Sequence, residues 1–345
     1  MNEKTTDRGI RLGAKTVCLM LGFALVSQFG LAQELDCGGF DRPIVFAGLD
    51  WDSALIHNAV AREILETGYG CESTDIPGST IPMFQGMIRG DIDVTMEIWP
   101  DNLAASWDDA LEAGEVVDLG INFPDSVQGF YVPTYVIEGD PERDIDSMAP
   151  DLESVFDLPE YAELFTDPEQ PDRGRFYNCV IGWACEEINT RKLEAYGLDE
   201  HFTNFPPGSG EALAASLASA YARGEPWFGY YWGPTWVLGA FDMTLLEEPE
   251  HSEECWETDF ACAYPTVPVL VSVSSDFYQQ APAEVIDFLE NYETTGALTS
   301  ELLAYAQDHD AQPEEAAVHF LRTQPEVWTQ WVPAEVAERI QAALE

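Results

Sequence analysis

A pattern of short apolar runs and amphipathic stretches occurs twice along the chain, at almost the same spacing. Each copy predicts a strand, a helix, a second strand or turn, a second helix ending in Arg-Gly, and a third strand. The first copy comprises 44–51, about 53–66, 72–78, about 81–88 and 93–99. The second comprises 179–183, about 185–196, 205–210, about 211–222 and 226–232. In both copies the first and third strands end in tryptophan, which indicates an internal repeat.

The segments that follow each copy also correspond. After the first copy come a helix at 102–113, a strand at 116–123 and a further strand at 129–137. After the second copy come a helix at 234–241, a strand at 243–249 and a further strand at 266–273. Strands that alternate with helices predict an α/β fold with a mixed sheet in each copy. We expect the strand at 129–137 to enter a second lobe and the strand at 266–273 to return. The two lobes are then 33–128 plus 268–345, including a helical tail from 282, and 129–267, hinged at two crossover strands.

Four tryptophans are placed where such sheets bind ligands. Ligands of open α/β sheets lie beyond the carboxyl ends of the strands. The repeat places Trp51, Trp99, Trp183 and Trp232 at such ends, facing a cleft between the lobes. An aromatic box of this kind attracts a quaternary ammonium group by cation–π forces and excludes water. Stacking on a sugar is the alternative use of cleft tryptophans. The other six tryptophans are interpreted as packing residues.

Charge excludes several classes of partner. The 345 residues include 63 acidic and 15 basic side chains, for a formal net charge of −48. Nucleic acid and anionic membrane surfaces are therefore excluded, since both require basic protein surface. Lys192 is the single lysine beyond residue 32. Such self-repulsion is tolerable where salt screens it, which favours a saline external medium over a merely acidic secreted protein.

The first residues and the cysteines both point to export. Residues 1–32 have a basic start, an apolar run at 17–26 and small residues before Gln33, as in a cleaved signal peptide. An uncleaved membrane anchor is the alternative. Six cysteines follow, an even number that predicts disulfides in an exported chain. Short spacing favours Cys179–Cys185 and Cys255–Cys262, which leaves Cys37–Cys71, although six cysteines allow many pairings. A zinc site is the alternative use of these cysteines.

The residues around the four tryptophans resemble a known family. The segments GLDWDSALIHNAVAREILETGYG, PGSTIPMFQGMIRGDIDVTMEIW, GWACEEIN and YYWGPTWVL are similar to the substrate-binding proteins of ABC importers for glycine betaine and related compatible solutes. The resemblance implies a type II-like periplasmic-binding-protein fold, a periplasmic monomer, and a permease partner in the inner membrane. It also implies that the tryptophans hold a trimethylammonium group and that the backbone N–H groups of Ala184 and Cys185 hold a carboxylate. Free N–H groups at a helix start bind anions.

One departure leaves the ligand open. Some relatives carry a histidine shortly after the tryptophan at Trp99, where this chain has Pro100-Asp101-Asn102. His57 is a possible replacement, or else a helix-packing residue. Glu97 points to the same strand face as Trp99 and suits a cation or an N-oxide better than a carboxylate. Glycine betaine is the first choice, and trimethylamine N-oxide, choline and a sulfonium analogue are alternatives.

The sequence predicts no catalytic residue, no metal site and no cofactor. The common hydrolase, metalloprotease and nucleotide-binding motifs do not occur, so a carboxylate-dependent hydrolase is a remote alternative. Asp167, Glu169 and Asp172 in the loop DPEQPD have the oxygen ligands that Ca²⁺ prefers, but they lack EF-hand spacing. A solvated acidic loop is the favoured interpretation of this segment.

Overall fold

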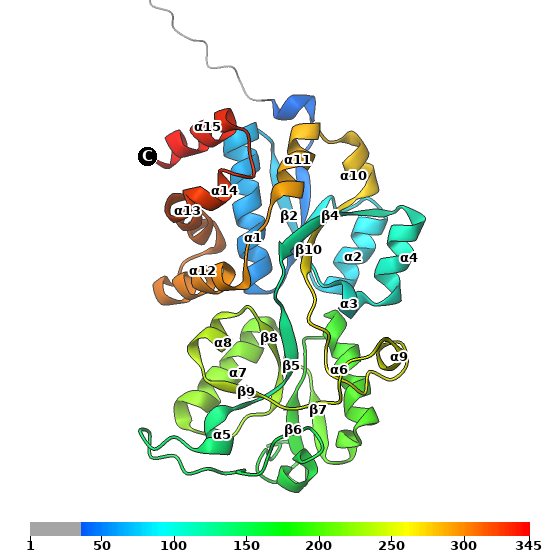
Figure 1. Cartoon of the computed structure of the whole chain (residues 1–345), viewed down its shortest axis with the longest axis vertical. Helices are drawn as coiled ribbons and strands as arrows, with labels where there is room; N and C mark the ends of the chain where they lie inside the picture. The colour runs from blue at the N-terminus through cyan, green and yellow to red at the C-terminus, as the bar shows by residue number, and fades with distance from the viewer. Residues whose placement is uncertain (1–35) are drawn as a thin grey trace, which may run out of the picture. The chain divides into compact units, whose positions relative to one another are not determined.

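The computed structural model describes residues 36–345, so the expected signal peptide at 1–32 lies outside the described residues. Two five-stranded sheets, each covered by helices, follow one another along the chain (Figure 1). Helices and strands alternate as the α/β prediction requires, which confirms the predicted fold class. Among the described helices, none is both long and apolar enough to cross a membrane.

The first sheet has the strand order β2-β1-β3-β10-β4. The strands β1, β2 and β3 are parallel, and β10 is antiparallel to both of its neighbours. Their bounds are β1 Ile44–Leu49, β2 Ser73–Gly78, β3 Val94–Ile98, β4 Val116–Phe123 and β10 Val269–Ser274. The central strands β3 and β10 are buried throughout, because helices cover both faces of this sheet.

The second sheet repeats this arrangement with the order β7-β6-β8-β5-β9. The strands β6, β7 and β8 are parallel, and β5 is antiparallel to β8 and β9. Their bounds are β5 Val127–Pro133, β6 Gly174–Tyr177, β7 Phe202–Phe205, β8 Gly229–Gly233 and β9 Met243–Leu245. Position by position, the second sheet matches the first, so the internal repeat predicted from the sequence is present in the topology.

Each sheet receives one strand from beyond its own copy of the repeat. The chain leaves the first sheet after β4 and at once forms β5, which lies between β8 and β9 of the second sheet. It returns after β9, through a long segment, to form β10 between β3 and β4. The two connections between the sheets run side by side in Figure 1. The predicted pair of crossovers is therefore confirmed.

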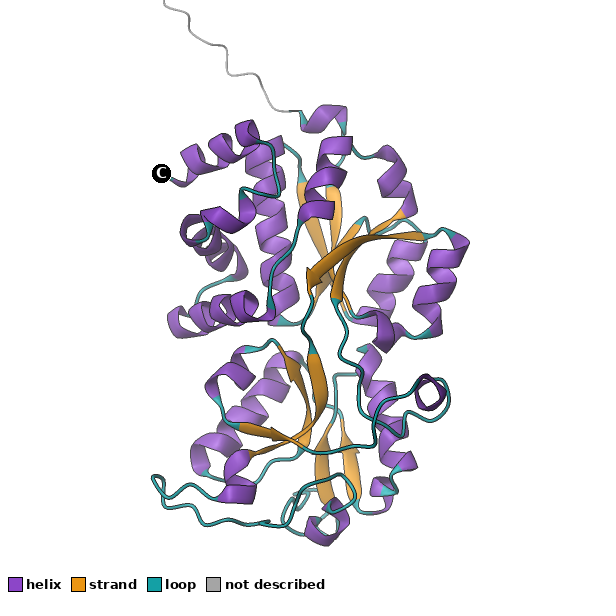
Figure 2. Ribbon diagram, in the orientation of Figure 1, coloured by secondary structure: helices purple, strands orange, loops and turns teal. Residues whose placement is uncertain are grey.

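Helices pack around each sheet, and the tail helices pack against α1 (Figure 2). Around the first sheet they are α1 Asp52–Glu63, continued by a π-helical turn at Ile64–Tyr69, α2 Thr80–Ile88, α3 Pro100–Leu103, α4 Ala105–Ala113, α10 Ser275–Gln280, α11 Ala283–Asn291, α12 Gly296–His309, α13 Pro313–Thr323, α14 Pro325–Trp328 and α15 Ala334–Leu344. Around the second they are α5 Thr134–Glu138, α6 Ala184–Ala195, α7 Gly210–Arg223, α8 Trp236–Ala240 and α9 Glu253–Trp256.

Three local predictions were wrong. The run 179–183 is no strand, because the first strand of the second copy is β6, which begins five residues before this run and ends at Tyr177. Asn178 ends that strand, since its side chain accepts a hydrogen bond from the N–H of Cys179 (2.6 Å). The predicted strand 129–137 ends at Pro133, after which α5 begins. The predicted helix 102–113 begins earlier and is interrupted at Ala104, whose φ of 46° is not helical.

Three disulfides join the two cysteine pairs that short spacing favoured in the sequence and the pair that this choice left over. Cys37–Cys71 ties the first described residues to the start of β2, and Cys255–Cys262 closes a short loop around α9. The third disulfide, Cys179–Cys185, joins the segment after β6 to the first turn of α6. This disulfide holds the start of α6 in place.

The net charge predicts a strong effect of salt on stability. Raising the salt concentration from about 0.01 M to about 1 M shortens the screening length from about 30 Å to about 3 Å. With a formal charge of −48, the folded chain is expected to melt at least about 4 °C higher in the saltier buffer. Thermal unfolding followed by circular dichroism measures this. A melting temperature that stays flat or falls contradicts the interpretation of the acidic surface as an adaptation to salt.

Candidate functional site

The four tryptophans that end the predicted strands come together in one small cavity. Trp183 is at the centre of the group, because its ring lies edge-on to Trp51 (centroids 5.6 Å apart) and to Trp232 (5.2 Å). All four rings are at most 8% exposed. The cavity is lined by Trp51, Thr80, Trp99, Asn102, Trp183, Ala184, Cys185, Tyr230 and Trp232. We call Trp51, Trp99, Trp183 and Trp232 the tryptophan cage.

Three members of the cage occupy the same local position. Trp51, Trp99 and Trp183 are the residues immediately before α1, α3 and α6, whereas Trp232 lies within β8. The sequence placed all four at strand ends, which is correct only in part. A residue just before a helix is held by the hydrogen bonds of the first turn, so the rings of these three tryptophans are set by helix starts.

One wall of the cavity is polar and carries free N–H groups. Ala184 and Cys185 are the first two residues of α6, and the N–H groups of a first helical turn have no acceptor within the helix. The partial positive charge of the helix start adds to their attraction for an anionic group. Both residues line the cavity.

Sequence reasoning missed three polar residues of the lining, Thr80, Asn102 and Tyr230. Tyr230 precedes Trp232 by two residues on β8, so strand alternation places both side chains on one face. Asn102 follows Trp99 by three residues at the start of α3, which is the spacing of neighbours on a helix surface. Both signals were present in the sequence. Thr80 lines the cavity only because α2 packs against the second copy of the repeat, so no local sequence pattern marks it.

Contacts between the two copies of the repeat surround the cage. The indole N–H of Trp183 donates to Asp50 Oδ1 (2.6 Å), and the N–H of Ile81 donates to the carbonyl of Gly182 (3.2 Å). Gly182 has a φ of 98° and lies against Ser79, so a side chain would be both strained and obstructed there. These contacts join the two copies of the repeat beside the cage.

An amide pair forms a further contact between the two copies. Asn102 on α3 donates to Gln128 Oε1 on β5 (3.0 Å), and Gln128 donates back to Asn102 Oδ1 (3.2 Å). Tyr230 also donates to Gln128 Oε1 (2.7 Å). Gln128 is the second residue of the strand that crosses into the second sheet. The polar lining of the cavity is thereby bonded to the crossover itself.

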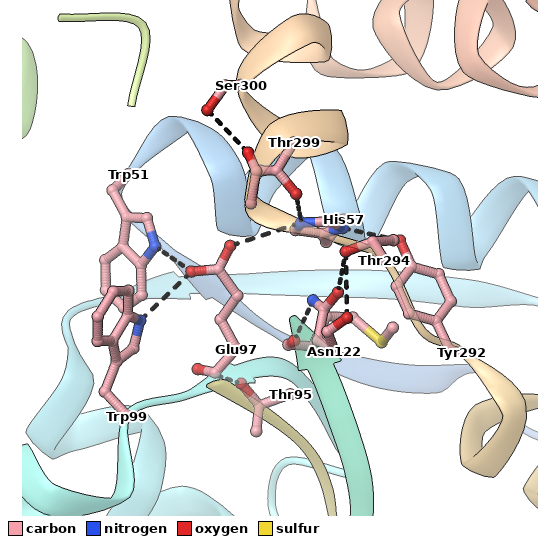
Figure 3. Close-up of polar contacts among 12 residues, drawn as sticks. Trp51, His57, Thr95, Glu97, Trp99, Asn122, Tyr292, Thr294, Thr299 and Ser300 are labelled. Carbon is pink, nitrogen blue, oxygen red and sulfur yellow. Dashed lines mark hydrogen bonds and ion pairs between the residues drawn. The ribbon is translucent and has the colours of Figure 1, made fainter. Parts of the chain in front are cut away.

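Glu97 and His57 lie behind the cage and do not line its cavity. Glu97 is buried on β3, and its Oε2 accepts hydrogen bonds from the indole N–H groups of Trp51 (2.7 Å) and Trp99 (3.4 Å; Figure 3). His57 is buried on α1 and is hydrogen-bonded to Tyr292 (2.8 Å) and Thr299 (3.3 Å). His57 is therefore placed as a packing residue of the helix.

Comparisons with known proteins identify the family of the chain. The sequence model of one protein family, the substrate-binding domain of ABC-type glycine betaine transport systems, matches residues 42–323. The chain belongs to this family. It is 26% identical over 321 residues to the trimethylamine N-oxide-binding protein of Pelagibacter ubique, which covers 91% of this chain and 98% of that protein. A 95-residue stretch is 35% identical to the glycine betaine/proline betaine-binding periplasmic protein of Escherichia coli, covering 26% of this chain and 28% of that protein.

Solved structures show the same fold. A choline-binding protein of an ABC transporter, in complex with choline, superposes with a TM-score of 0.71 at 18% identity, covering 90% of this chain and 99% of that chain. The glycine betaine, L-proline ABC transporter binding protein of Borrelia burgdorferi gives 0.69 at 19% identity, covering 87% and 100%. At these identities the likeness concerns the fold.

A second, larger cavity adjoins the cage in this substrate-binding domain. It has a volume of about 210 Å³ and shares Trp51 and Trp232 with the cage. The carboxyl groups of Asp50, Asp52 and Glu211 line it, and burial together with Glu211 raises the pKa of Asp52. Carboxylates that line a cavity raise the local concentration of cations.

The acidic loop considered for Ca²⁺ has another role. Asp167 is buried and forms an ion pair with Arg175 (2.6 Å) at the start of the second sheet. The favoured interpretation of a solvated acidic loop is therefore wrong for Asp167, while Glu169 and Asp172 are exposed. Within residues 36–345, no group of three or more histidine, cysteine or acidic side chains is arranged to hold a metal ion.

Glu97 is expected to give this binding domain a pH-dependent stability. Burial raises the pKa of Glu97 from its ordinary value of 4.5 to about 7, although the hydrogen bonds from Trp51 and Trp99 oppose the shift. Between these two values the folded state keeps a proton that the unfolded state has released, so folding stability falls as the pH rises from about 4.5 to about 7.

Glu97→Gln is therefore expected to stabilise the ligand-free protein by roughly 3 kcal/mol at a pH above 7, and to change its stability little near pH 4. The glutamine keeps an acceptor for the indole N–H groups and carries no charge. Urea unfolding of both proteins at the two pH values measures the difference. An equal effect of the substitution at both pH values contradicts the buried, ionisable carboxyl.

Proposed function

We propose that the protein is an extracytoplasmic receptor that captures a net-neutral trimethylammonium solute, glycine betaine or trimethylamine N-oxide, and delivers it to an ABC permease. It performs no chemistry on the ligand. The observation that carries this proposal is the cavity itself, in which four tryptophans from two sheets meet and every lining side chain is uncharged. A trimethylammonium group has no N–H to donate, so aromatic faces are its natural partners.

The strength of such a cage is sufficient for a receptor. Each well-placed ring contributes about 0.5–2 kcal/mol to the binding of a cation, depending on how far the site is desolvated. The cage rings are at most 8% exposed, which places them toward the upper part of that range. Micromolar affinity requires about 8 kcal/mol, so four rings supply a large share of it.

The polar wall supports a zwitterion. The N–H groups of Ala184 and Cys185, at the start of α6, are suited to donate hydrogen bonds to the anionic end of the ligand, and Thr80 and Asn102 add neutral donors. Glycine betaine then places its carboxylate against α6. Trimethylamine N-oxide is the second candidate, because one oxygen needs only one or two of these donors and the relative that matches along 91% of this chain is named for it.

Delivery to the permease rests on closure of two lobes. We assign 33–128 plus 268–345 to one lobe and 129–267 to the other, with 1–32 as the signal for export to the periplasm. The hydrogen bonds Trp183–Asp50 and Ile81–Gly182 cross between these lobes beside the cage. A ligand that fills the cage stabilises this closed arrangement, and the permease binds it in preference to the open one.

Calorimetric titration of the purified protein tests the proposal. Glycine betaine, trimethylamine N-oxide and choline are titrated alongside glycine, which lacks the methyl groups. At least one of the two net-neutral trimethylammonium solutes is expected to bind in the micromolar range, with choline weaker and glycine undetectable. Glycine binding as tightly as glycine betaine, or no binding of any trimethylammonium compound, contradicts the proposed function.

A further inference from the structure

Glu97 is a buried carboxyl with no cationic side chain to pair with. It is 1% exposed, and within residues 36–345 no arginine or lysine forms an ion pair with it. Its Oε1 has no hydrogen-bond partner there, and the nearest basic atom is His57 Nε2 at 4.0 Å. A carboxylate left in this state is costly, because both its charge and one of its oxygens are uncompensated.

The other oxygen of Glu97 links it to the ligand cage. Oε2 accepts from Trp51 Nε1 at 2.7 Å and from Trp99 Nε1 at 3.4 Å, so one atom fixes two of the four rings (Figure 3). A negative charge beside an indole N–H polarises the ring and makes its faces more negative. The cage and the carboxyl therefore act as one electrostatic unit.

Resting on the proposed function, we propose that Glu97 is a positioning residue whose missing counter-ion is the trimethylammonium group of the bound ligand, held on the far side of the Trp51 and Trp99 rings. Ligand binding and ionisation of Glu97 then favour each other, so binding releases a proton. The affinity of the receptor accordingly rises with pH and reaches its full value only when Glu97 is ionised.

The surroundings of Glu97 identify it as the group that titrates. Burial raises the pKa of Glu97 to about 7 and lowers the pKa of His57 to about 3, so His57 stays neutral across the range in question. Tyr292, which bonds to His57, has its pKa raised by burial and by Glu97. Asp52 at the start of α1 and Asp101 in α3 are the acids of the helices that follow Trp51 and Trp99, and the pKa of each is raised by burial.

The test measures ligand affinity and proton release between about pH 5.5 and about pH 8.5. If the ligand lowers the pKa of Glu97 by about one unit, the affinity of the native protein rises about tenfold across this range. Calorimetry in two buffers with different ionisation enthalpies measures the released proton directly. In Glu97→Gln, the affinity is expected to stay at the low-pH level of the native protein, with no proton released.

Asp93→Asn is the matched control, because Asp93 is a buried acid that precedes β3 and is paired with Arg42 (2.5 Å). This variant is expected to keep both the pH slope and the proton release. A slope that persists in Glu97→Gln, or a native protein whose affinity is independent of pH, overturns the inference while leaving the receptor intact. Failure of every trimethylammonium compound to bind at any pH instead overturns the proposed function.

Discussion

Replacing Trp183 with alanine is expected to weaken ligand binding by about 2 kcal/mol or more, which is about thirtyfold in the dissociation constant. The ring of Trp183 contacts both Trp51 and Trp232, so its removal opens the centre of the cage. The substitution also removes the hydrogen bond from the indole N–H to Asp50, which joins the two copies of the repeat. Calorimetric titration of the native and variant proteins measures the loss.

A matched pair of conservative variants separates binding from folding. Trp328 is as buried as the cage tryptophans, but it lies in α14 of the helical tail, where its indole N–H donates to the carbonyl of Leu321 (2.8 Å). Trp328→Phe is expected to lower the melting temperature and leave the affinity unchanged, whereas Trp183→Phe is expected to lower the affinity. Equal losses of affinity in the two variants contradict the assignment of the cage.

Lys192→Met is expected to lower the free energy of unfolding by about 3–5 kcal/mol, because it leaves a buried carboxylate without its cation. Lys192 on α6 is fully buried and contacts Glu248 at 2.7 Å. Burial lowers the pKa of Lys192 and raises that of Glu248, although each partner favours the charge of the other. Tyr196 also donates to Glu248 (2.9 Å), and Lys192 lies over the ring of Tyr264. Urea unfolding measures the change.

The double variant Lys192→Met, Glu248→Gln identifies the cause. It removes both charges, so most of the lost stability is expected to return. Arg89→Met is the control, since Arg89 pairs with Asp91 at an exposed site where an ion pair contributes about 0–1 kcal/mol. If the double variant is no more stable than Lys192→Met, the loss comes from packing around α6 instead of from an unpaired charge.

The repeat explains why much of the fold could be predicted from the sequence. Apolar runs and glycine-closed helices recur in the same order, and a strand that leaves one copy has to join the other to bury both of its faces. The pairing of β5 and β10 with the opposite sheets follows from that requirement. The segment 179–183 could not be placed, since its apolar residues read as a strand, whereas the Asn178 side chain and the disulfide Cys179–Cys185 hold it as a loop.

The site, like the fold, could be predicted from the sequence only in part. The four tryptophans could be selected because the repeat marks equivalent positions. The direction of the Glu97 side chain could not be predicted, because strand alternation relates Glu97 to Trp99 only if both residues lie in the strand. Trp99 instead begins the turn into α3, so its ring turns toward the cavity while Glu97 stays behind it. Contacts such as Asn102–Gln128 depend on how the two copies meet, which no local pattern records.

The central claim is that the tryptophan cage recognises the positive charge of a trimethylammonium group and not merely its shape. The tightest ligand of the titration panel is compared with its carbon isostere, in which a quaternary carbon replaces the nitrogen: 3,3-dimethylbutanoate for glycine betaine, or tert-butanol for trimethylamine N-oxide. Cation–π attraction from four desolvated rings predicts that the charged ligand binds at least about a hundredfold more tightly. Affinities within about threefold of each other would contradict the account.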